Sequence, residues 1–360
     1  MMNVTIVGAG NVGTQLAVHC AESGMRVIIY SSKPNKLHRE LKIINAEDEI
    51  IHRGIIDKVT NDPEDAFFQA ELIIVTVPAN LMSESAEIIE PYAHNRMKIC
   101  LVPGTGGGEC AFKKCMQRGA TIFGVQRVPS VARLVEYGDT VRAVGYRDHM
   151  YVASLPSSKA EECAKIVQDI VGIKCSALPN YLNLTLTPSN PILHTTRLKV
   201  LFENYSDTKV YDRVPLFYEE WNDETSELLF ACDDEVQQIC SELKVFDLSY
   251  VKSLKVHYES DTVEGLTQKI KSIEGFRGLL SPMISTKDGF IVDWASRYFT
   301  ADFPYGLLVL IEIADMLGLE VPNMRNVYSW YQRLNDEIQG FSFGRYGIHN
   351  MDDLISFYSL

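Results

Sequence analysis

The sequence predicts an α/β fold in which a doubly wound parallel sheet is followed by a second, mostly α-helical domain. Short β-branched runs alternate with helical patterns up to about residue 178, and such alternation is typical of a parallel sheet with helices on its faces. A glycine-rich turn joins the first strand to the first helix. Beyond residue 190, apolar residues recur mainly at helical spacing. We therefore expect one domain over residues 1–182 and a helical domain over residues 183–360.

The glycine-rich turn follows a β-branched strand at residues 3–7 and leads into a helix. It reads Gly8, Ala9, Gly10, Asn11, Val12 and Gly13. Gly8 lets the chain turn off the strand, Gly10 lets the backbone approach a pyrophosphate, and Gly13 lets the helix pack closely on the sheet. The helix N-terminus offers N–H groups and a partial positive charge to the anion. The pattern predicts a dinucleotide-binding Rossmann domain, and a glycine-rich turn without a ligand is the alternative.

The end of the second strand, residues 26–30, bears on which nucleotide binds. An Asp or Glu at this point usually holds the ribose hydroxyls of NAD. This chain has Ser31, Ser32 and Lys33 instead. Hydroxyl groups and a cation suit a 2′-phosphate, which a carboxylate would repel. The sequence therefore favours NADP(H), with NAD left open and a plain surface role for Lys33 as the alternative.

The rest of the first domain continues the alternation. Asp62 is expected to cap a helix that starts at Pro63. The strand at 72–77 ends at Pro78, and the carboxyl end of such a strand faces the cofactor. The glycine-rich stretch 103–108 is interpreted equally well as a close approach to a ligand or as a flexible surface loop. Further strands are expected at 99–102, 121–125, 142–145 and 151–153, and a helix at 161–171.

The second domain begins after a polar stretch at 180–189, which we interpret as a linker. Asn190 is expected to cap a helix that begins at Pro191 and runs to about residue 205. Additional helices are expected at 228–243, 263–273, 306–317 and 324–334.

Composition excludes several classes of partner. The net charge of −13 argues against nucleic acid and anionic membranes. No apolar run reaches the roughly 18 residues of a membrane span, and a strand at the N-terminus leaves no room for a signal peptide, so we expect a cytoplasmic protein. The eight cysteines form no CxxC pair, and we expect reduced core thiols and no metal site. Apolar helix faces leave open whether the chain forms a homodimer.

Three second-domain residues are candidates for chemistry. His194 falls in the first turn of its expected helix, where the partial positive charge disfavours imidazolium and suits a proton-transfer group. A histidine packed in an interface is the alternative. On pattern alone, Asp302 is an N-cap for the helix at 306–317, and Arg297 is a surface cation.

The chain resembles the octopine/nopaline (opine) dehydrogenases along nearly its whole length. The residues that carry the resemblance lie in stretches 8–13, 102–107, 129–138, 190–194 and 297–306. Members of this family condense the amine of an amino acid with a 2-keto acid and reduce the product with a nicotinamide cofactor. The resemblance implies that His194 transfers protons, that Asp302 pairs with it, and that Arg297 binds a substrate carboxylate. It also implies amino-acid and 2-keto-acid substrates.

Two alternatives stay open. One is another two-domain NAD(P) dehydrogenase acting on a hydroxy acid or a polyol phosphate, which would use a lysine, and Lys199 is the lysine on the His194 helix. The other is a nucleotide-sensing protein without turnover. Further candidates to line the pocket for the amine donor are Arg127, Arg133 and Tyr305. The sequence is equally compatible with a purely structural role for these three residues.

Overall fold

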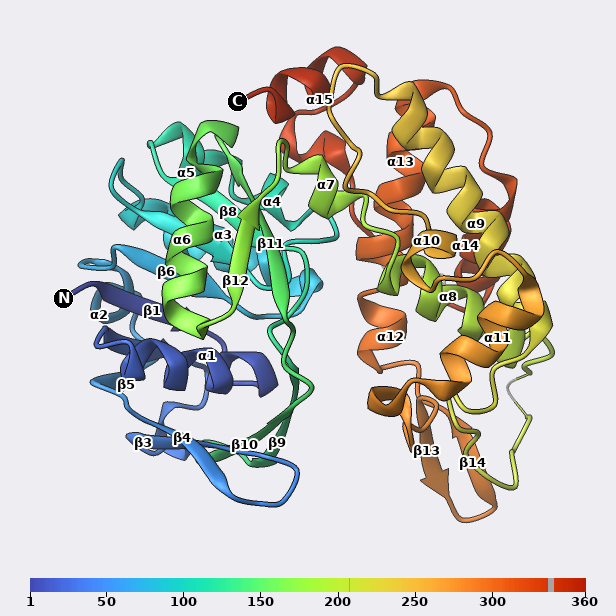
Figure 1. Ribbon diagram of the computed structural model, residues 1–360, viewed down its shortest axis with the longest axis horizontal. Helices are drawn as coiled ribbons and strands as arrows, with labels where there is room; N and C mark the ends of the chain where they lie inside the picture. The colour runs from blue at the N-terminus through green and yellow to red at the C-terminus, as the bar shows by residue number, and fades with distance from the viewer. Residues whose placement is uncertain (207, 336–339) are drawn as a thin grey trace. The chain divides into compact units, whose positions relative to one another are not determined.

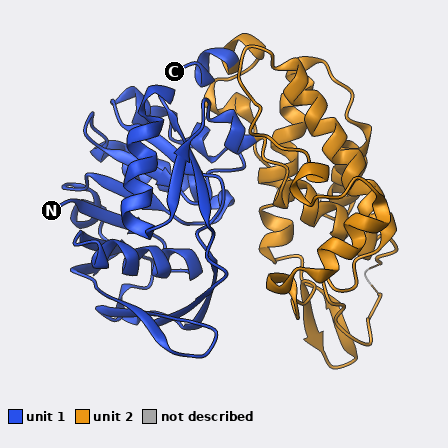
Figure 2. Ribbon diagram, viewed as in Figure 1, with its two compact units in different colours: residues 1–185, 355–360 blue, residues 186–354 orange. Residues whose placement is uncertain are grey.

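The computed structural model describes residues 1–206, 208–335 and 340–360, which form two compact units (Figure 2). Unit 1 contains residues 1–185 and 355–360, and unit 2 contains residues 186–354. The chain therefore passes between units twice, after Thr185 and after Leu354, because its last six residues return to unit 1. In the part of the chain that is described, no helix is long and apolar enough to cross a membrane.

Unit 1 is built on an eight-stranded sheet with the order β12-β11-β8-β7-β6-β1-β2-β5 (Figure 1). Its strands are β1 (Asn3–Val7), β2 (Arg26–Tyr30), β5 (Lys58–Thr60), β6 (Leu72–Val75), β7 (Lys98–Leu101), β8 (Thr121–Val125), β11 (His149–Leu155) and β12 (Lys174–Ala177). The predicted α/β class and parallel sheet are confirmed, except that β11 runs antiparallel to β8. The chain between these two strands forms a hairpin and no crossover helix, so it does not return to the end of the sheet where β8 began.

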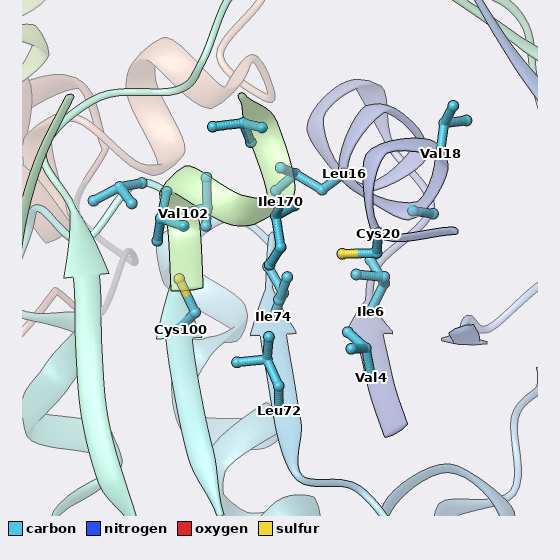
Figure 3. Close-up of a cluster of buried hydrophobic side chains, with 14 of the residues drawn as sticks. Val4, Ile6, Leu16, Val18, Cys20, Leu72, Ile74, Cys100, Val102 and Ile170 are labelled. Carbon is cyan, nitrogen blue, oxygen red and sulfur yellow. The ribbon is translucent and has the colours of Figure 1, made fainter. Parts of the chain in front are cut away.

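Helices and apolar side chains cover both faces of this sheet. Leu72 and Ile74 of β6 belong to one buried cluster, which also contains residues of α1 and α6, whereas Ile73 and Val75 belong to a second cluster. Figure 3 shows part of the first cluster, with Ile74 below Ile170 of α6. Burial on both faces explains why β6 is continuously apolar.

The helices of this unit are α1 (Asn11–Glu22), α2 (Pro63–Phe67), α3 (Met82–Ile89), α4 (Gly108–Ala111), α5 (Lys113–Gln117), α6 (Ala160–Val171) and α7 (Leu182–Thr185). Asp62 caps α2 as predicted, its carboxylate accepting the Glu64 N–H.

A second sheet in unit 1, with the order β4-β3-β10-β9, was largely missed by the sequence analysis. Its strands are β3 (Glu40–Ile44), β4 (Ile50–Ile55), β9 (Val131–Glu136) and β10 (Thr140–Val144). These strands mix charged and apolar residues because one face is exposed, which weakens their signal in the sequence. Gly54 of β4 lies against α1, where a Cβ would be 2.8 Å from the Cα of Val18. The sheet therefore packs directly on α1.

Unit 2 is mostly helical, as predicted, with one hairpin of β13 (Met283–Thr286) and β14 (Gly289–Val292) that was not expected. Its helices include α8 (Asn190–Leu201), α9 (Asp223–Glu242), α10 (Leu254–His257), α11 (Val263–Ser272), α12 (Arg297–Thr300), the π-helical turn η6 (Phe303–Leu307), α13 (Leu308–Leu317) and α14 (Pro322–Leu334). The last helix, α15 (Met351–Tyr358), ends in unit 1. Short 3₁₀ turns lie at η1 (Pro34–Lys36), η2 (Ala79–Leu81), η3 (Glu90–Tyr92), η4 (Ser157–Lys159), η5 (Glu274–Phe276) and η7 (Phe343–Tyr346).

The interpretation of residues 180–189 as a linker is wrong, because most of this stretch is buried and part of it is helical. Its polar side chains serve internal hydrogen bonds. The Asn180 amide donates to the Tyr358 carbonyl at 2.6 Å, and the Thr185 hydroxyl donates to the buried carboxylate of Glu109. The Tyr358 hydroxyl donates to the same Glu109 oxygen at 2.6 Å. Burial raises the pKa of Glu109. One carboxylate thus binds residues next to both passages between the units.

We expect Glu109→Ala to lower the free energy of unfolding by about 2–4 kcal/mol, because two buried hydroxyls lose their acceptor. Urea denaturation of the full chain measures this, with the exposed Glu136→Ala as the matched control. Equal stability of the two variants would contradict a structural role for Glu109.

Candidate active site

His194 lies near the start of α8 and is held from both ring nitrogens. Its side chain is 3% exposed, with Nδ1 2.8 Å from Asp302 Oδ2 and Nε2 2.8 Å from the Tyr218 hydroxyl. The helix begins at Asn190 and ends at Leu201, so His194 lies one residue beyond the first turn and Asn190 is not the cap. The helix dipole therefore acts on this ring less directly than the sequence suggested. Hydrogen bonds decide the state of the ring.

Asp302 reaches His194 because two segments approach closely. It precedes η6, and Gly306 of η6 packs on Pro191 of α8, where a Cβ would lie 3.1 Å from Pro191 Cγ. Asp302 occupies the N-cap position of η6, as the local pattern predicts, but its side chain accepts no backbone N–H there. A π-helical turn is rare and often occurs at functional sites. Here it places a carboxylate beside an imidazole.

The hydrogen bonds assign the tautomer of His194. An ionised carboxylate only accepts, so Nδ1 carries the hydrogen that is shared with Asp302. In the neutral ring, Nε2 then accepts from the Tyr218 hydroxyl. Burial raises the pKa of Tyr218 well above its ordinary value, which keeps that hydroxyl protonated. The ring can therefore take up a proton at Nε2, with Asp302 supporting the resulting imidazolium.

Arg297 and Tyr298 continue this site from α12. The ring of Tyr298 meets the His194 ring edge-on, with centroids 4.6 Å apart. The Arg297 guanidinium lies 5.4 Å from the centroid of the Tyr298 ring. Arg297 is exposed, and none of the ion pairs found among the described residues involves it. Its charge is therefore compatible with binding a carboxylate from outside the chain. Sequence reasoning missed both Tyr218 and Tyr298.

The glycine-rich turn of unit 1 has the geometry that nucleotide binding needs. Gly8 adopts a φ of +100°, which favours glycine. A Cβ at Gly13 would lie only 2.0 Å from the Gly8 carbonyl oxygen, so the turn and α1 pack without space for a side chain. At Gly10, by contrast, a Cβ would meet nothing within 4 Å. No side chain caps α1, whose first N–H groups can face an anion.

Three other predicted nucleotide-site residues lie near this turn. The Asn11 Oδ1 accepts the Leu134 N–H at 2.7 Å, so part of its side chain holds β9. Val12 packs partly buried against the core. Pro78 follows β6, which pairs with β1, and thus lies at the same edge of the sheet as Gly8. Whether these residues contact a cofactor stays a prediction.

The end of β2 presents hydroxyls and a cation. Ser31 is buried, and its Oγ accepts the Lys33 N–H at 3.2 Å. The Tyr137 hydroxyl lies 3.5 Å from the same Oγ, contributed by the turn that joins β9 to β10. Ser32 and Lys33 are exposed, and no ion pair found in the described ranges involves Lys33. Tyr137 is remote in sequence and was not predicted.

The remaining candidates have mixed outcomes. The stretch 103–108 is mostly buried, with Gly104 packed on Gly124, so the interpretation as a flexible surface loop is wrong. Lys199 pairs with the carboxylate of Glu203. Arg127 and Arg133 belong to unit 1 and Tyr305 to unit 2, and their role at an amine-donor pocket stays a prediction.

One group of metal-type ligands occurs in unit 1. The ligand atoms of His19, Glu22 and His52 lie within 4.8 Å of one another. His52 Nδ1 is 2.7 Å from Glu22 Oε2, and His19 Nε2 is 3.2 Å from the Tyr146 hydroxyl, so each histidine has a hydrogen-bond partner within the chain. Burial lowers the pKa of His19 to about 4, and electrostatic repulsion from His52 acts in the same direction. The eight cysteines are free thiols.

Two family models match the chain. The model of the NAD/NADP octopine/nopaline dehydrogenase alpha-helical domain matches residues 177–335. The model of the NAD-dependent glycerol-3-phosphate dehydrogenase N-terminus matches residues 3–114. The first match contains the His194 site and the second contains the glycine-rich turn.

Individual proteins match over most of the chain. An opine dehydrogenase of Haliotis discus hannai is 29% identical over 346 residues, which is 87% of this chain and 84% of that protein. A tauropine dehydrogenase of Arabella iricolor is 24% identical over 400 residues, covering 99% and 100%. Among solved structures, octopine dehydrogenase with NADH and L-arginine has a TM-score of 0.85 at 21% identity, covering 99% of this chain and 98% of that one. This last likeness establishes the shared fold.

We expect Gly13→Ala to weaken binding of NADPH and NADH at least about tenfold, because the added methyl group forces the turn away from α1. Fluorescence titration of the full chain with each nucleotide measures this. Gly275→Ala is the control, since a Cβ there meets nothing within 4 Å. Unchanged affinity in Gly13→Ala would contradict this turn as the nucleotide site.

Proposed function

Because this chain belongs to the NAD/NADP octopine/nopaline dehydrogenase family, we propose that it is an NAD(P)H-dependent opine dehydrogenase. It joins the amine of an amino acid to a 2-keto acid. The cofactor supplies, when bound, the hydride that reduces the imine. The observation that carries the proposal is the buried pair of His194 and Asp302, inside the region that matches the helical-domain model.

His194 acts as the proton-transfer group in this proposal. Attack of the amine nitrogen on the keto carbon forms a carbinolamine, which must lose its hydroxyl as water to become the imine. Protonated Nε2 gives a proton to the departing hydroxyl, and the C–O bond breaks as the nitrogen lone pair forms the C=N bond, so that water leaves and the protonated imine, which keeps the N–H hydrogen and carries the positive charge, is the hydride acceptor. Asp302 keeps Nδ1 protonated and stabilises the imidazolium. Such general acid–base catalysis contributes about 10²–10⁴-fold in rate.

Arg297 orients the substrate in this proposal. Every 2-keto acid carries a carboxylate next to its carbonyl group, and a guanidinium can hold a carboxylate through two parallel hydrogen bonds. Its freedom from ion pairs among the described residues supports this role. Positioning of this kind lowers the entropic part of the barrier.

We infer NADP(H) as the preferred cofactor. The buried Ser31, the exposed Ser32 and Lys33, and the neighbouring Tyr137 hydroxyl offer hydrogen-bond donors and a positive charge to a 2′-phosphate. The coarser assignment, an NAD(P)-binding dehydrogenase, follows from the family itself.

The rival hydroxy-acid or polyol-phosphate dehydrogenase is less well supported. The glycerol-3-phosphate dehydrogenase model matches only the nucleotide-binding part, residues 3–114. Lys199, the lysine on α8, forms an ion pair with Glu203.

Free cysteine thiols fit the reducing cytoplasm in which we propose that the enzyme acts.

We expect His194→Ala to lower kcat at least about 100-fold while the dissociation constant of NADPH changes less than about twofold, because the imidazole serves chemistry and not nucleotide binding. The assay follows NADPH absorbance with pyruvate and a panel of single amino acids. The exposed His349→Ala is the matched control. Full activity in His194→Ala would favour the rival dehydrogenase, and NADPH binding by wild type without turnover on any pair would favour a sensor.

We expect Lys33→Ala to weaken NADPH binding about tenfold and to leave NADH binding unchanged, because only NADPH has the 2′-phosphate. Parallel fluorescence titrations with both nucleotides measure the ratio. Lys174→Ala, another exposed lysine of unit 1, controls for the general loss of one positive charge. An equal effect on both nucleotides would contradict the assignment.

A further inference from the structure

We propose that Tyr218 is a positioning residue for proton transfer at His194. Its hydroxyl fixes the orientation of the His194 ring through a hydrogen bond to Nε2, and this bond forms whether the ring is neutral or protonated. This proposal rests on the proposed function of His194. Nε2 is the nitrogen that exchanges the proton, because Nδ1 is bound to Asp302. The Tyr218 hydroxyl is 2.8 Å from Nε2, and the residue is 4% exposed.

The backbone around Tyr218 is tied to the helix that carries His194. Arg197 of α8 is 2% exposed and donates from Nε to the Phe217 carbonyl and from Nη2 to the Glu220 carbonyl, both at 2.9 Å. Burial lowers the pKa of Arg197 to about 10, so it remains charged at neutral pH. A charged donor on carbonyls makes strong hydrogen bonds. The segment that carries Tyr218 is therefore docked one turn away from His194 on the same helix.

A second anchor fixes the far end of this segment. Glu220 receives two hydrogen bonds from Arg213 and one from the Leu216 N–H. The hydrogen bond to Arg213 is the largest cause that lowers the pKa of Glu220 to about 2, so its carboxylate stays ionised. The hydrogen bond from the Leu216 N–H to Glu220 thus closes the turn, and Arg197 binds two of its backbone carbonyl groups.

Stacking orients the ring itself. The ring of Tyr218 lies on Phe276 with centroids 3.9 Å apart and planes at 14°, and nearly parallel to Trp221 at 6.2 Å and 8°. Phe217 meets both Tyr218 and His194 edge-on. With the ring plane and the backbone both held, the hydroxyl has little freedom except rotation about its C–O bond.

That rotation suits a proton-transfer group. The hydroxyl donates to Nε2 when the ring is neutral, and after protonation its oxygen accepts the Nε2 hydrogen, which it shares with the substrate oxygen in a three-centre hydrogen bond as the proton is transferred. The second bond involves a charged donor and is stronger, so Tyr218 favours the imidazolium. No atom or proton is gained or lost by Tyr218 itself in this exchange. It acts through His194.

Tyr218→Phe removes the hydroxyl and keeps the stacked ring. We expect kcat to fall about 5- to 10-fold, with KM for both substrates and the NADPH dissociation constant within twofold, because one hydrogen bond is lost at the reacting group. The limb of the pH–kcat profile that depends on His194 should move to lower pH by about half a unit, since the imidazolium loses the stronger bond. The other charged or titratable groups around the hydroxyl, which are Asp302, Arg297, Tyr298 and Tyr258, are unchanged.

Tyr331→Phe is the matched control, because Tyr331 is a buried tyrosine of unit 2 whose hydroxyl has no hydrogen-bond partner in the described part of the chain. It should leave kcat and the pH profile unchanged. A Tyr218→Phe enzyme with wild-type kcat and pH profile would overturn the proposal. A loss as deep as that of His194→Ala would also overturn it, by making the hydroxyl the group that meets the substrate.

A measurement without turnover separates this proposal from the proposed function. NMR titration of ¹⁵N-labelled histidine rings follows His194 directly, with the His194→Gln spectrum identifying its signals. Tyr218→Phe should move the titration midpoint of these signals to lower pH by about half a unit, whether or not any substrate pair reacts. An unmoved midpoint would overturn the role of Tyr218 even in an active enzyme.

Discussion

The hydrogen bond between His194 and Asp302 is the interaction on which the chemistry that we propose for unit 2 depends. It joins residues 108 positions apart, and it forms because Gly306 lets η6 pack on Pro191 at the start of α8. An aspartate that would otherwise cap a helix is thereby aimed at an imidazole. The bond places a hydrogen on Nδ1 and leaves Nε2 for the proposed proton exchange. It also stabilises a positive charge on the ring, which is buried.

In unit 1 too, glycine residues allow two backbone segments to pack closely together. Gly13 and Gly8 meet where a side chain would not fit, so α1 begins directly at the end of β1 with its first N–H groups uncapped. The second sheet packs on α1 through Gly54 and brings Leu134 to Asn11. It also brings the Tyr137 hydroxyl next to Ser31. The edge of the sheet that carries the glycine-rich turn is therefore shaped by strands that the Rossmann pattern alone does not contain.

Buried polar groups in this protein are used to hold segments in place. Within unit 1, Glu109 binds Thr185 and Tyr358, which lie near the two points where the chain passes between the units. In unit 2, Arg197 binds carbonyl groups on both sides of Tyr218. Burying a charged group costs free energy unless it is hydrogen-bonded. Each of these residues therefore stabilises the one arrangement of neighbouring segments in which its hydrogen bonds form. This explains why polar stretches such as residues 180–189 are internal.

The sequence by itself determined the α/β class, the order of the main strands and helices, the glycine-rich turn between β1 and α1 and the helical character of unit 2, because these follow from local periodicity and from glycine spacing. Resemblance to a family pointed to His194, Asp302 and Arg297, whereas local pattern made Asp302 a cap. Only the tertiary structure decided that Asp302 meets His194, that Tyr218 and Tyr298 join them, and that β11 runs antiparallel. These contacts join residues far apart in the chain, and no local pattern records which distant groups packing will bring together.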